Sequence, residues 1–466
     1  MITSLPTHRA KRAFMLLTFL LAAGSISAKK ILVKSIAELQ TAINSAAPGD
    51  VITLASGVYT TTEDITINRN GTKEQPVSIT AEKPGGTEIT GAGGFKIVSP
   101  STWIVISGFK FTHAANKAVM EGGTAFCRWT RNTFINTGEG NYLTVIGNDH
   151  TVDYNTFQDK NSLGKFIGVR GTGKQIAERL WIHHNYFHNF SPQKGNGAEA
   201  VQFGLSGYSL SSSNSIFEYN LFENCAGENE LLSVKSSAVT IRYNTIRDCK
   251  AQFTLRHGNF CKVYGNYFFN TPGLRIFGDD HIIYSNYFEN CKPAINIGNG
   301  GAEVADGAPL TSHDRPDRVV IAFNTLINNE DNITRTERKN GIGTTAITLA
   351  YNLIQGGGEA VSIQGPLYVN PVWKGNVIFN TKGAGQMPAE GYTTFDPKLV
   401  KNATGTYHLQ KGSPAIDAVK EGYTGITADM DGQERKGALD IGADEVSVQP
   451  VTARALHPAD VGCNAK

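Results

Sequence analysis

The chain has 466 residues, and its 43 lysines and arginines nearly balance 41 aspartates and glutamates. With no basic run in addition, this balance gives no indication of nucleic-acid binding. The 50 glycines and the scarcity of long helical apolar repeats exclude a mainly helical protein. The length alone would predict about three domains, but all-β and solenoid chains of this size form single units.

Residues 1–28 have the pattern of a secretory signal. Basic residues between His8 and Arg12 precede an apolar run, Ala13–Gly24, and small residues follow as far as Ala28. A membrane anchor is the alternative, but the run is shorter than the roughly 20 residues that span a bilayer. We therefore expect a secreted or periplasmic protein whose mature chain has no membrane span.

A short helix is predicted near the start of the mature chain. Ser35 followed by Glu38 is a capping-box pattern, and Leu39 and Ile43 follow at helical spacing. The helix is expected over residues 36–46. Because a solenoid leaves the core of its first coil open, we interpret this helix as an N-terminal cap.

An asparagine followed by a short apolar pair recurs along the chain. The repeated residues are Asn132, Asn155, Asn185, Asn220, Asn244, Asn266, Asn286, Asn324, Asn352 and Asn376. Their most frequent spacing, 20–24 residues, is typical of stacked coils that bury apolar faces only against their neighbours. Asparagine tolerates left-handed turn geometry and can hydrogen-bond its equivalent in the next coil, so we interpret these residues as structural.

The repeat predicts an all-β fold, a right-handed parallel β-helix of about a dozen coils over residues 29–448. A β-propeller is the alternative, but its blades take about 40–50 residues, twice this period. Residues 449–466 are polar and contain proline, and we expect a surface tail. Cys225, Cys249 and Cys291 each follow a repeat asparagine by five residues, which favours buried thiols; a Cys225–Cys249 disulfide is the alternative.

Two intervals of the repeat are longer than the others and contain polar, glycine-rich stretches, residues 204–214 and 298–317. Long polar loops on a rigid scaffold commonly flank a binding groove. They bracket the stretch Glu228–Ser236, which carries the most informative residues of the chain.

Three basic residues occupy nearly the same place in successive repeats. Lys235, Arg256 and Arg275 precede the next repeat asparagine by 9, 10 and 11 residues. Stacked strands lie about 4.8 Å apart, so Lys235 and Arg256 are expected to be neighbours on one face. Like charges this close repel each other, which requires an anionic partner. A solvated, salt-bridged face is the alternative.

Glu228 and Glu230 are two residues apart, so both side chains leave the same side of a strand. Two carboxylates directed together repel each other unless a cation lies between them, and calcium prefers several hard oxygen ligands. Asn196, in a turn of the preceding coil, can supply a third oxygen. The sequence therefore predicts a calcium site formed by these three residues.

Acids beside a lysine and an arginine suit β-elimination on a uronic acid polymer. The reaction removes the C5 proton, which is α to a carboxylate, and expels the C4 oxygen; a cation neutralises the carboxylate. Lys235 is the expected base, since a nearby cation and arginine can lower the pKa of a lysine. Arg256 is a poor proton donor, because a guanidinium stays protonated in proteins, and is expected to stabilise charge. His257 either assists or packs in a turn.

These residues resemble polysaccharide lyase family 6, which contains alginate lyases and chondroitinase B. The resemblance is carried by Asn196, Glu228-x-Glu230, Lys235-Ser236, Arg256-His257-Gly258 and the segment from Gly273 to His281. Lys235 follows Glu230 by five residues and Arg256 follows Lys235 by 21, as in the family. The resemblance implies a calcium-dependent lyase on a parallel β-helix, with Lys235 as base and Arg256 as acid or charge stabiliser.

The amino-acid sequences of the motifs resemble those of the alginate lyases more closely than that of chondroitinase B. Alginate is therefore the expected partner, and chondroitin or dermatan sulfate is the alternative. One departure concerns Gln202, where members usually have arginine, so a contact to a substrate carboxylate is in question. The candidates for substrate contacts are Gln202, Tyr208, His257, Arg275, His281, Arg315 and Arg335.

Two other classes of protein remain as rivals. An epimerase or glycoside hydrolase can use the same scaffold, but a hydrolase needs two carboxyl groups that flank the scissile bond. A non-catalytic β-helix that binds uronate polymers would lose no turnover when Lys235 is replaced.

Overall fold

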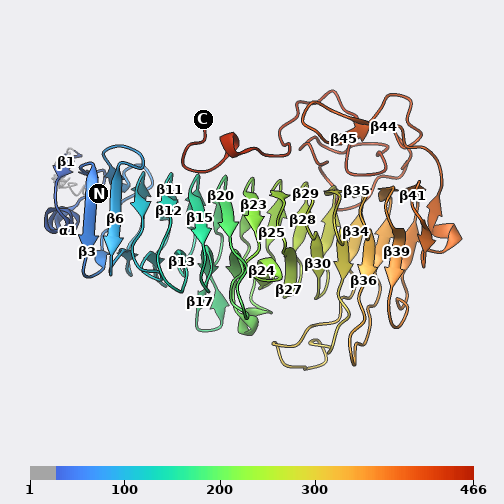
Figure 1. Ribbon diagram of the computed structural model, residues 1–466, viewed down its shortest axis with the longest axis horizontal. Helices are drawn as coiled ribbons and strands as arrows, with labels where there is room; N and C mark the ends of the chain where they lie inside the picture. The colour runs from blue at the N-terminus through green and yellow to red at the C-terminus, as the bar shows by residue number, and fades with distance from the viewer. Residues whose placement is uncertain (1–27) are drawn as a thin grey trace, which may run out of the picture.

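Three long parallel sheets run the length of the molecule in a computed structural model that describes residues 28–466. Each coil contributes one strand to sheet A, then one to sheet B, then one to sheet C, and strands of successive coils pair in parallel (Figure 1). The predicted all-β parallel β-helix is confirmed, and the propeller alternative is excluded. The predicted signal, residues 1–28, lies outside the described residues except for its last residue.

Sheet A contains β1 (Lys30–Val33), β2 (Val51–Leu54), β5 (Val77–Ala81), β8 (Ile104–Ser107), β11 (Arg128–Thr130), β14 (Thr151–Asp153), β19 (Trp181–His183), β22 (Ile216–Glu218), β25 (Thr240–Arg242), β28 (Lys262–Tyr264), β31 (Ile282–Tyr284), β34 (Val320–Ala322), β37 (Thr348–Ala350) and β40 (Val372–Lys374). Sheet B contains β3 (Gly57–Thr61), β6 (Thr87–Gly91), β9 (Lys110–Phe111), β12 (Thr133–Phe134), β15 (Thr156–Lys160), β20 (Tyr186–Phe190), β23 (Leu221–Cys225), β26 (Thr245–Arg247), β29 (Tyr267–Phe269), β32 (Tyr287–Glu289), β35 (Thr325–Ile327), β38 (Leu353–Gln355), β41 (Asn376–Phe379) and β43 (Tyr392–Thr393). Sheet C contains β4 (Ile65–Ile67), β7 (Phe95–Ile97), β10 (Val119–Met120), β13 (Leu143–Val145), β16 (Ile167–Val169), β21 (Val201–Phe203), β24 (Glu230–Lys235), β27 (Gln252–His257), β30 (Leu274–Ile276), β33 (Ile295–Ile297), β36 (Ile333–Arg335), β39 (Glu359–Ile363) and β42 (Gly383–Gly385). Two antiparallel hairpins stand apart from these sheets, β17 (Gly171–Thr172) with β18 (Gln175–Ile176) and β44 (Leu399–Lys401) with β45 (Tyr407–Leu409). The helical elements are α1 (Ile36–Ser45) and three short 3₁₀ turns, η1 (Ser206–Tyr208), η2 (Ala389–Gly391) and η3 (Pro458–Asp460).

The ten repeat asparagines form one continuous buried ladder at the corner between sheets A and B. In each step, the side-chain oxygen accepts from the backbone N–H and the side-chain amide of the preceding asparagine, as between Asn155 and Asn132, both at 3.0 Å. The structural role is therefore confirmed. The left-handed backbone, however, belongs to the residue before most of these asparagines, such as His184 and Tyr219, and not to the asparagine itself.

The predicted helix is present as α1 at the N-terminal end of the β-helix (Figure 1). The Ser35 side chain accepts a hydrogen bond from the Glu38 N–H at 3.1 Å, and the Glu38 carboxylate accepts from the Lys34 N–H. Leu39 and Ile43 are fully buried and belong to the main apolar core. Among the described residues, no helix is long and apolar enough to span a bilayer.

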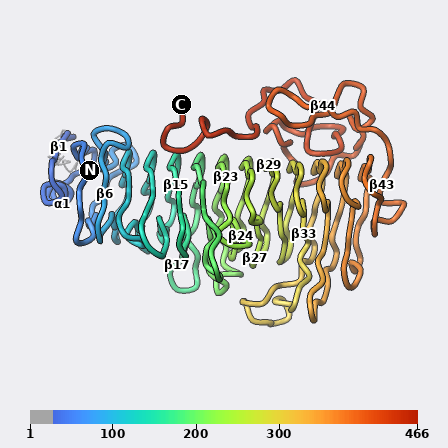
Figure 2. The backbone as a smooth tube through the Cα atoms, viewed as in Figure 1, coloured from blue at the N-terminus to red at the C-terminus, as the bar shows by residue number. Residues whose placement is uncertain are grey.

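After β43 the chain folds back over the outside of the later coils, and the last residues continue along the earlier ones (Figure 2). The expected surface tail, residues 449–466, is more closely packed than its composition indicated. Leu456 and Val461 are buried beside Leu221. The Leu456 N–H also donates to the Thr245 hydroxyl at 2.8 Å. All six cysteines are free thiols, and five of them are buried.

Candidate active site

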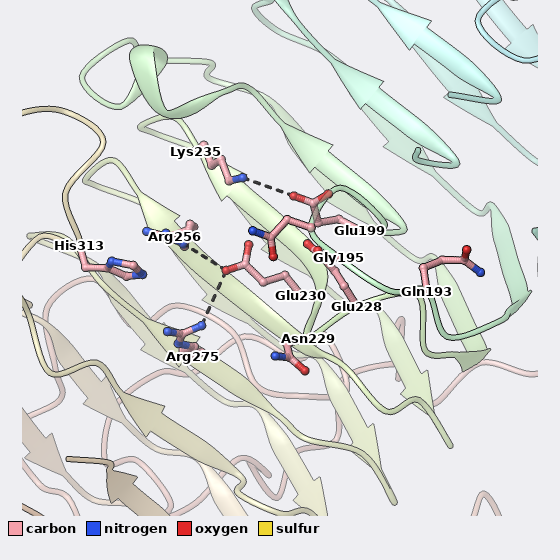
Figure 3. Close-up of a pocket in the computed structure, with 11 residues that line it drawn as sticks. Gln193, Gly195, Glu199, Glu228, Asn229, Glu230, Lys235, Arg256, Arg275 and His313 are labelled. Carbon is pink, nitrogen blue, oxygen red and sulfur yellow. Dashed lines mark hydrogen bonds and ion pairs between the residues drawn. The ribbon is translucent and has the colours of Figure 1, made fainter. Parts of the chain in front are cut away.

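A polar groove of about 490 Å³ lies on the outer face of sheet C. Its walls come from the turns that join sheets B and C, from β24, β27 and β30, and from the loop between β33 and β34. The lining residues are Gln193, Gly195, Asn196, Glu199, Glu228, Asn229, Glu230, Lys235, Arg256, Arg275 and His313 (Figure 3). Every one of these side chains except that of glycine is polar or charged, which suits a charged, hydroxyl-rich ligand.

An irregular pairing of β24 with β27 positions the basic residues. Val234 pairs with Leu255, but the next residue, Lys235, pairs with His257, so Arg256 is an extra residue in its strand. Such a bulge redirects side chains, and Arg256 lines the groove. Arg275 pairs with Thr254 and not with Arg256. The expectation of one basic row at nearly the same register is therefore wrong in detail, although all three residues reach the groove.

Glu230 is the anionic partner of the two arginines. Its Oε1 lies 3.2 Å from Arg256 Nε and 3.7 Å from Arg275 Nη1. Its Oε2 accepts a hydrogen bond from the Ser233 hydroxyl at 2.6 Å. Figure 3 shows Glu230 between the two guanidinium groups, so the requirement for a negative group beside the basic residues is met by the chain itself.

Glu199 is a residue of the site that the sequence predictions did not include. Its carboxylate lies 3.3 Å from Lys235 Nζ and 3.3 Å from Lys165 Nζ, and its side chain is almost completely buried. Burial favours a higher pKa for Glu199, but the two ammonium groups outweigh it and hold the pKa below its ordinary value. The sequence feature that could have identified Glu199 as a site residue is its position three residues after Asn196, in the same turn.

Three carboxyl groups converge in the groove in a way that fits a cation. Oxygens of Glu199, Glu228 and Glu230 all lie within 4.8 Å of one another, and Asn196 lines the same wall. Burial, followed by the charge of Glu199, raises the pKa of Glu228 to about 7. Crowded hard oxygens of this kind suit a divalent cation such as calcium. The predicted ligands Asn196, Glu228 and Glu230 thus lie together, and the structure adds Glu199.

The family model described as chondroitinase B matches residues 33–426, which is most of the chain. The chain belongs to polysaccharide lyase family 6. Membership of a lyase family favours an enzyme over a non-catalytic binding module. No protein of curated function matches the sequence.

Solved structures of other family 6 lyases share the fold. The PL6 family alginate lyase AlyGC is 24% identical, with a TM-score of 0.74 over 82% of this chain and 56% of its own, so the chain spans little more than half the length of AlyGC. A mannuronic acid specific family 6 lyase from human gut microbiota is 23% identical (TM-score 0.68, 79% of this chain and 91% of its own). A PL6 alginate lyase in complex with a trisaccharide is also 23% identical (TM-score 0.69, 83% and 92%).

In this family 6 lyase, neither of the two histidines named as candidates for substrate contact lines the groove. His257 is buried, and its Nε2 accepts a hydrogen bond from Arg256 Nη1 at 3.1 Å, because a guanidinium can only donate. It therefore contacts Arg256 and does not line the groove. His281 is fully buried between the Cys261 N–H and the Phe277 carbonyl. The prediction that His281 contacts substrate is wrong, because its ring stabilises the backbone.

The other substrate candidates divide in the same way. Arg275 lines the groove, whereas Gln202 is buried behind it and donates to Glu199. Tyr208, in η1, packs partly against the core and does not line the groove. Arg315 pairs with Glu303, and Arg335 is fully buried against the Gln364 carbonyl, so neither is placed to bind a flanking carboxylate. Of these four residues, Gln202 and Arg335 are buried, Tyr208 lies outside the groove and Arg315 is held by an ion pair, none of which follows from their spacing in the sequence.

Proposed function

We propose that this family 6 lyase cleaves alginate by β-elimination, uses calcium and acts outside the cytoplasm. The observation that carries the proposal is the convergence of Lys235, Arg256 and the carboxyl groups of Glu199, Glu228 and Glu230 in one groove. The alginate lyases among the similar structures support this choice of polymer, and the basic and apolar pattern of residues 1–28 supports export.

Lys235 is the proposed base that takes the C5 proton of the uronate. Its side-chain nitrogen, which must be a neutral amine to take the proton, lies 3.3 Å from Glu199 and on the groove wall together with Arg256. Arg256 is held in turn by Glu230 and His257, so its guanidinium is fixed before substrate binds. A preorganised cation of this kind stabilises negative charge that develops in the transition state.

The acidic end of the groove is the proposed calcium site. Glu199, Glu228, Glu230 and Asn196 would hold the ion, which when bound would neutralise the uronate carboxylate beside C5. Arg275, held 3.7 Å from Glu230, can bind a carboxylate of the same or the adjoining sugar. The leaving C4 oxygen must also receive a proton. Because a guanidinium is a weak acid, this proton comes either from Arg256 or from a water molecule.

Incubation with alginate tests the reaction. Elimination creates an unsaturated end that absorbs ultraviolet light, whereas hydrolysis does not. The protein should produce such ends from alginate, and no absorbance on any uronate polymer would exclude elimination.

Chondroitin or dermatan sulfate is the second candidate substrate, because the matching family model is described as chondroitinase B. Parallel assays on alginate and dermatan sulfate distinguish the two. If unsaturated ends form faster from dermatan sulfate than from alginate, dermatan sulfate is the substrate and not alginate.

A further inference from the structure

His313 reaches the groove from a loop outside the motifs that carry the family resemblance in the sequence. The loop joins β33 to β34 and places the His313 ring edge-on against Phe277, with ring centroids 4.9 Å apart. His313 lines the catalytic groove and also an adjoining cavity of about 250 Å³ toward the C-terminal coils. The ring therefore lies where a polymer would pass from one to the other.

The hydrogen bond from Arg338 determines which ring nitrogen of His313 carries the proton. Arg338 Nη2 lies 3.2 Å from His313 Nδ1, and a guanidinium can only donate. Nδ1 must therefore accept, so the ring hydrogen is on Nε2. Burial, followed by the charges of Arg256, Arg338 and Arg275, lowers the pKa of His313 to about 3, which keeps the ring neutral. Among the described residues, none accepts a hydrogen bond from Nε2.

A second loop holds this one in place. The Ser209 hydroxyl donates to the Leu310 carbonyl at 2.9 Å, and the Ser209 carbonyl accepts from the Ser237 hydroxyl at 2.7 Å. Ser237 is two residues after Lys235. The His313 loop is thus joined to the coil of the proposed base by contacts within the chain itself.

The adjoining cavity has the chemistry of a second sugar site. Arg275 and Arg338 supply positive charge. Asn296 contributes a buried side-chain oxygen that has no hydrogen-bond partner among the described residues. A uronate offers a carboxylate to the arginines and hydroxyl groups to this oxygen.

We propose that His313 contacts the substrate as a hydrogen-bond donor. Its Nε2–H binds an oxygen of the sugar unit that lies next to Lys235, toward the adjoining cavity and the C-terminal coils. The proposal rests on the proposed function, since it needs a uronate polymer in the groove. A neutral imidazole adds a directional hydrogen bond beside two arginines without adding further positive charge, as neutral histidines do in other active sites.

Three substitutions at one position test the donor. His313→Ala removes it. His313→Asn keeps an acceptor for Arg338 but does not reach the Nε2 position, whereas His313→Gln places an amide N–H there. We expect a KM for mannuronate or guluronate tetramers about 10- to 100-fold higher in the Ala and Asn variants, with kcat little changed. The Gln variant should lie within a few-fold of the wild type. Thr311→Ala, an exposed change in the same loop, is the matched control.

Two further measurements separate this role from a structural one. The melting temperature, and its rise on addition of calcium, should be equal in all four variants and the wild type. Nitrogen NMR of the wild-type protein at neutral pH should show His313 neutral with the hydrogen on Nε2. A charged ring, a hydrogen on Nδ1, a normal KM for folded His313→Ala, or a Gln variant as impaired as Ala would each overturn the proposal.

Failure of the lyase proposal is recognisable separately. If the wild-type protein releases no unsaturated ends, the dissociation constants of the two tetramers for the wild type and His313→Ala replace KM. Equal constants would then overturn the role of His313, and a 10- to 100-fold weaker variant would support it (about the cost of one hydrogen bond to a charged group).

Discussion

In the groove, each basic side chain is positioned by its own contacts with neighbouring side chains. Lys235 is held by Glu199, and Arg256 is held by Glu230 and His257. The sequence was sufficient to predict that Lys235, Arg256, Glu228 and Glu230 lie close together, because these residues belong to two neighbouring coils. It could not reveal Glu199 as a partner of Lys235, since that contact depends on how the preceding turn folds over β24.

Replacement of Lys235 should remove catalysis without unfolding the protein. General-base residues contribute about 10²- to 10⁴-fold to rate, and Lys235→Ala should lose at least that factor in kcat. The side chain lies in the groove and not in the core, so the melting temperature should stay close to that of the wild type. The control is Lys262→Ala, an exposed lysine of sheet A, which should keep full activity. Turnover by Lys235→Ala at the wild-type rate would contradict the role of base.

Replacement of an asparagine of the ladder should lower the stability of the protein strongly, although the ladder does not line the groove. Asn220→Ala would remove the acceptor of the Asn185 N–H and the donor to the Ile182 carbonyl, both fully buried. Each orphaned buried group costs about 1–3 kcal/mol, so we expect a loss of roughly 3 kcal/mol in unfolding free energy. Thermal unfolding measures it, with the exposed Asn161→Ala as control. A melting temperature equal to the wild type would show that the ladder is dispensable there.

Among the elements, the loops and the C-terminal segment depart most from the repeat. Residues 204–214 and 298–317 were expected to flank a groove, and the second supplies His313. The polar composition of the tail did not reveal Leu456 and Val461 as buried residues, because burial there requires a matching apolar site near Leu221. A few apolar residues in a polar segment acquire a role only when a distant surface receives them.

The C-terminal segment predicts a pH-dependent stability through His408. Burial opposes the charged ring, but the hydrogen bond to Asp431 and the charges of Asp444 and Asp431 raise the pKa of His408 to about 9. A folded pKa above the unfolded value of about 6.5 gives a stabilisation that is complete below that value and is lost as the pH rises through 9. Asp431 also accepts from Tyr267 of β29, so this pair joins the segment to the β-helix.

The melting temperatures of the wild type and His408→Gln, measured from pH 6 to above pH 9, test this contribution. The wild type should be more stable at pH 6, and the difference should shrink as the pH rises. A difference that stays constant would contradict a charged His408–Asp431 pair. His457→Gln, an exposed histidine of the tail, is the matched control.

At the scale of the whole molecule, the β-helix is a rigid support on which a charged site is assembled from several coils. Three acids and three bases lie in one groove, so the folded state brings together carboxylates that repel each other. A cation bound there would relieve this repulsion and stabilise the folded protein by mass action.

Removal of calcium should therefore affect both activity and stability. Treatment with a chelator should abolish turnover and lower the melting temperature, and added calcium should restore both. Glu228→Gln should lose the calcium-dependent rise in melting temperature, whereas Glu330→Gln, at an exposed glutamate outside the groove, should keep it. Full activity after thorough removal of divalent cations would disprove the metal proposal.

By itself, the sequence determined the solenoid and predicted the kind of chemistry. The asparagine period reports contacts between adjacent coils, and the Glu-x-Glu, Lys and Arg-His spacings lie within that short range. Only the tertiary structure decided which other side chains share the groove. It brought in Glu199 and His313, and it placed His281 and Arg335 in the interior. The physical reason is that burial and pairing depend on strand register and loop packing, which spacing along the chain does not specify.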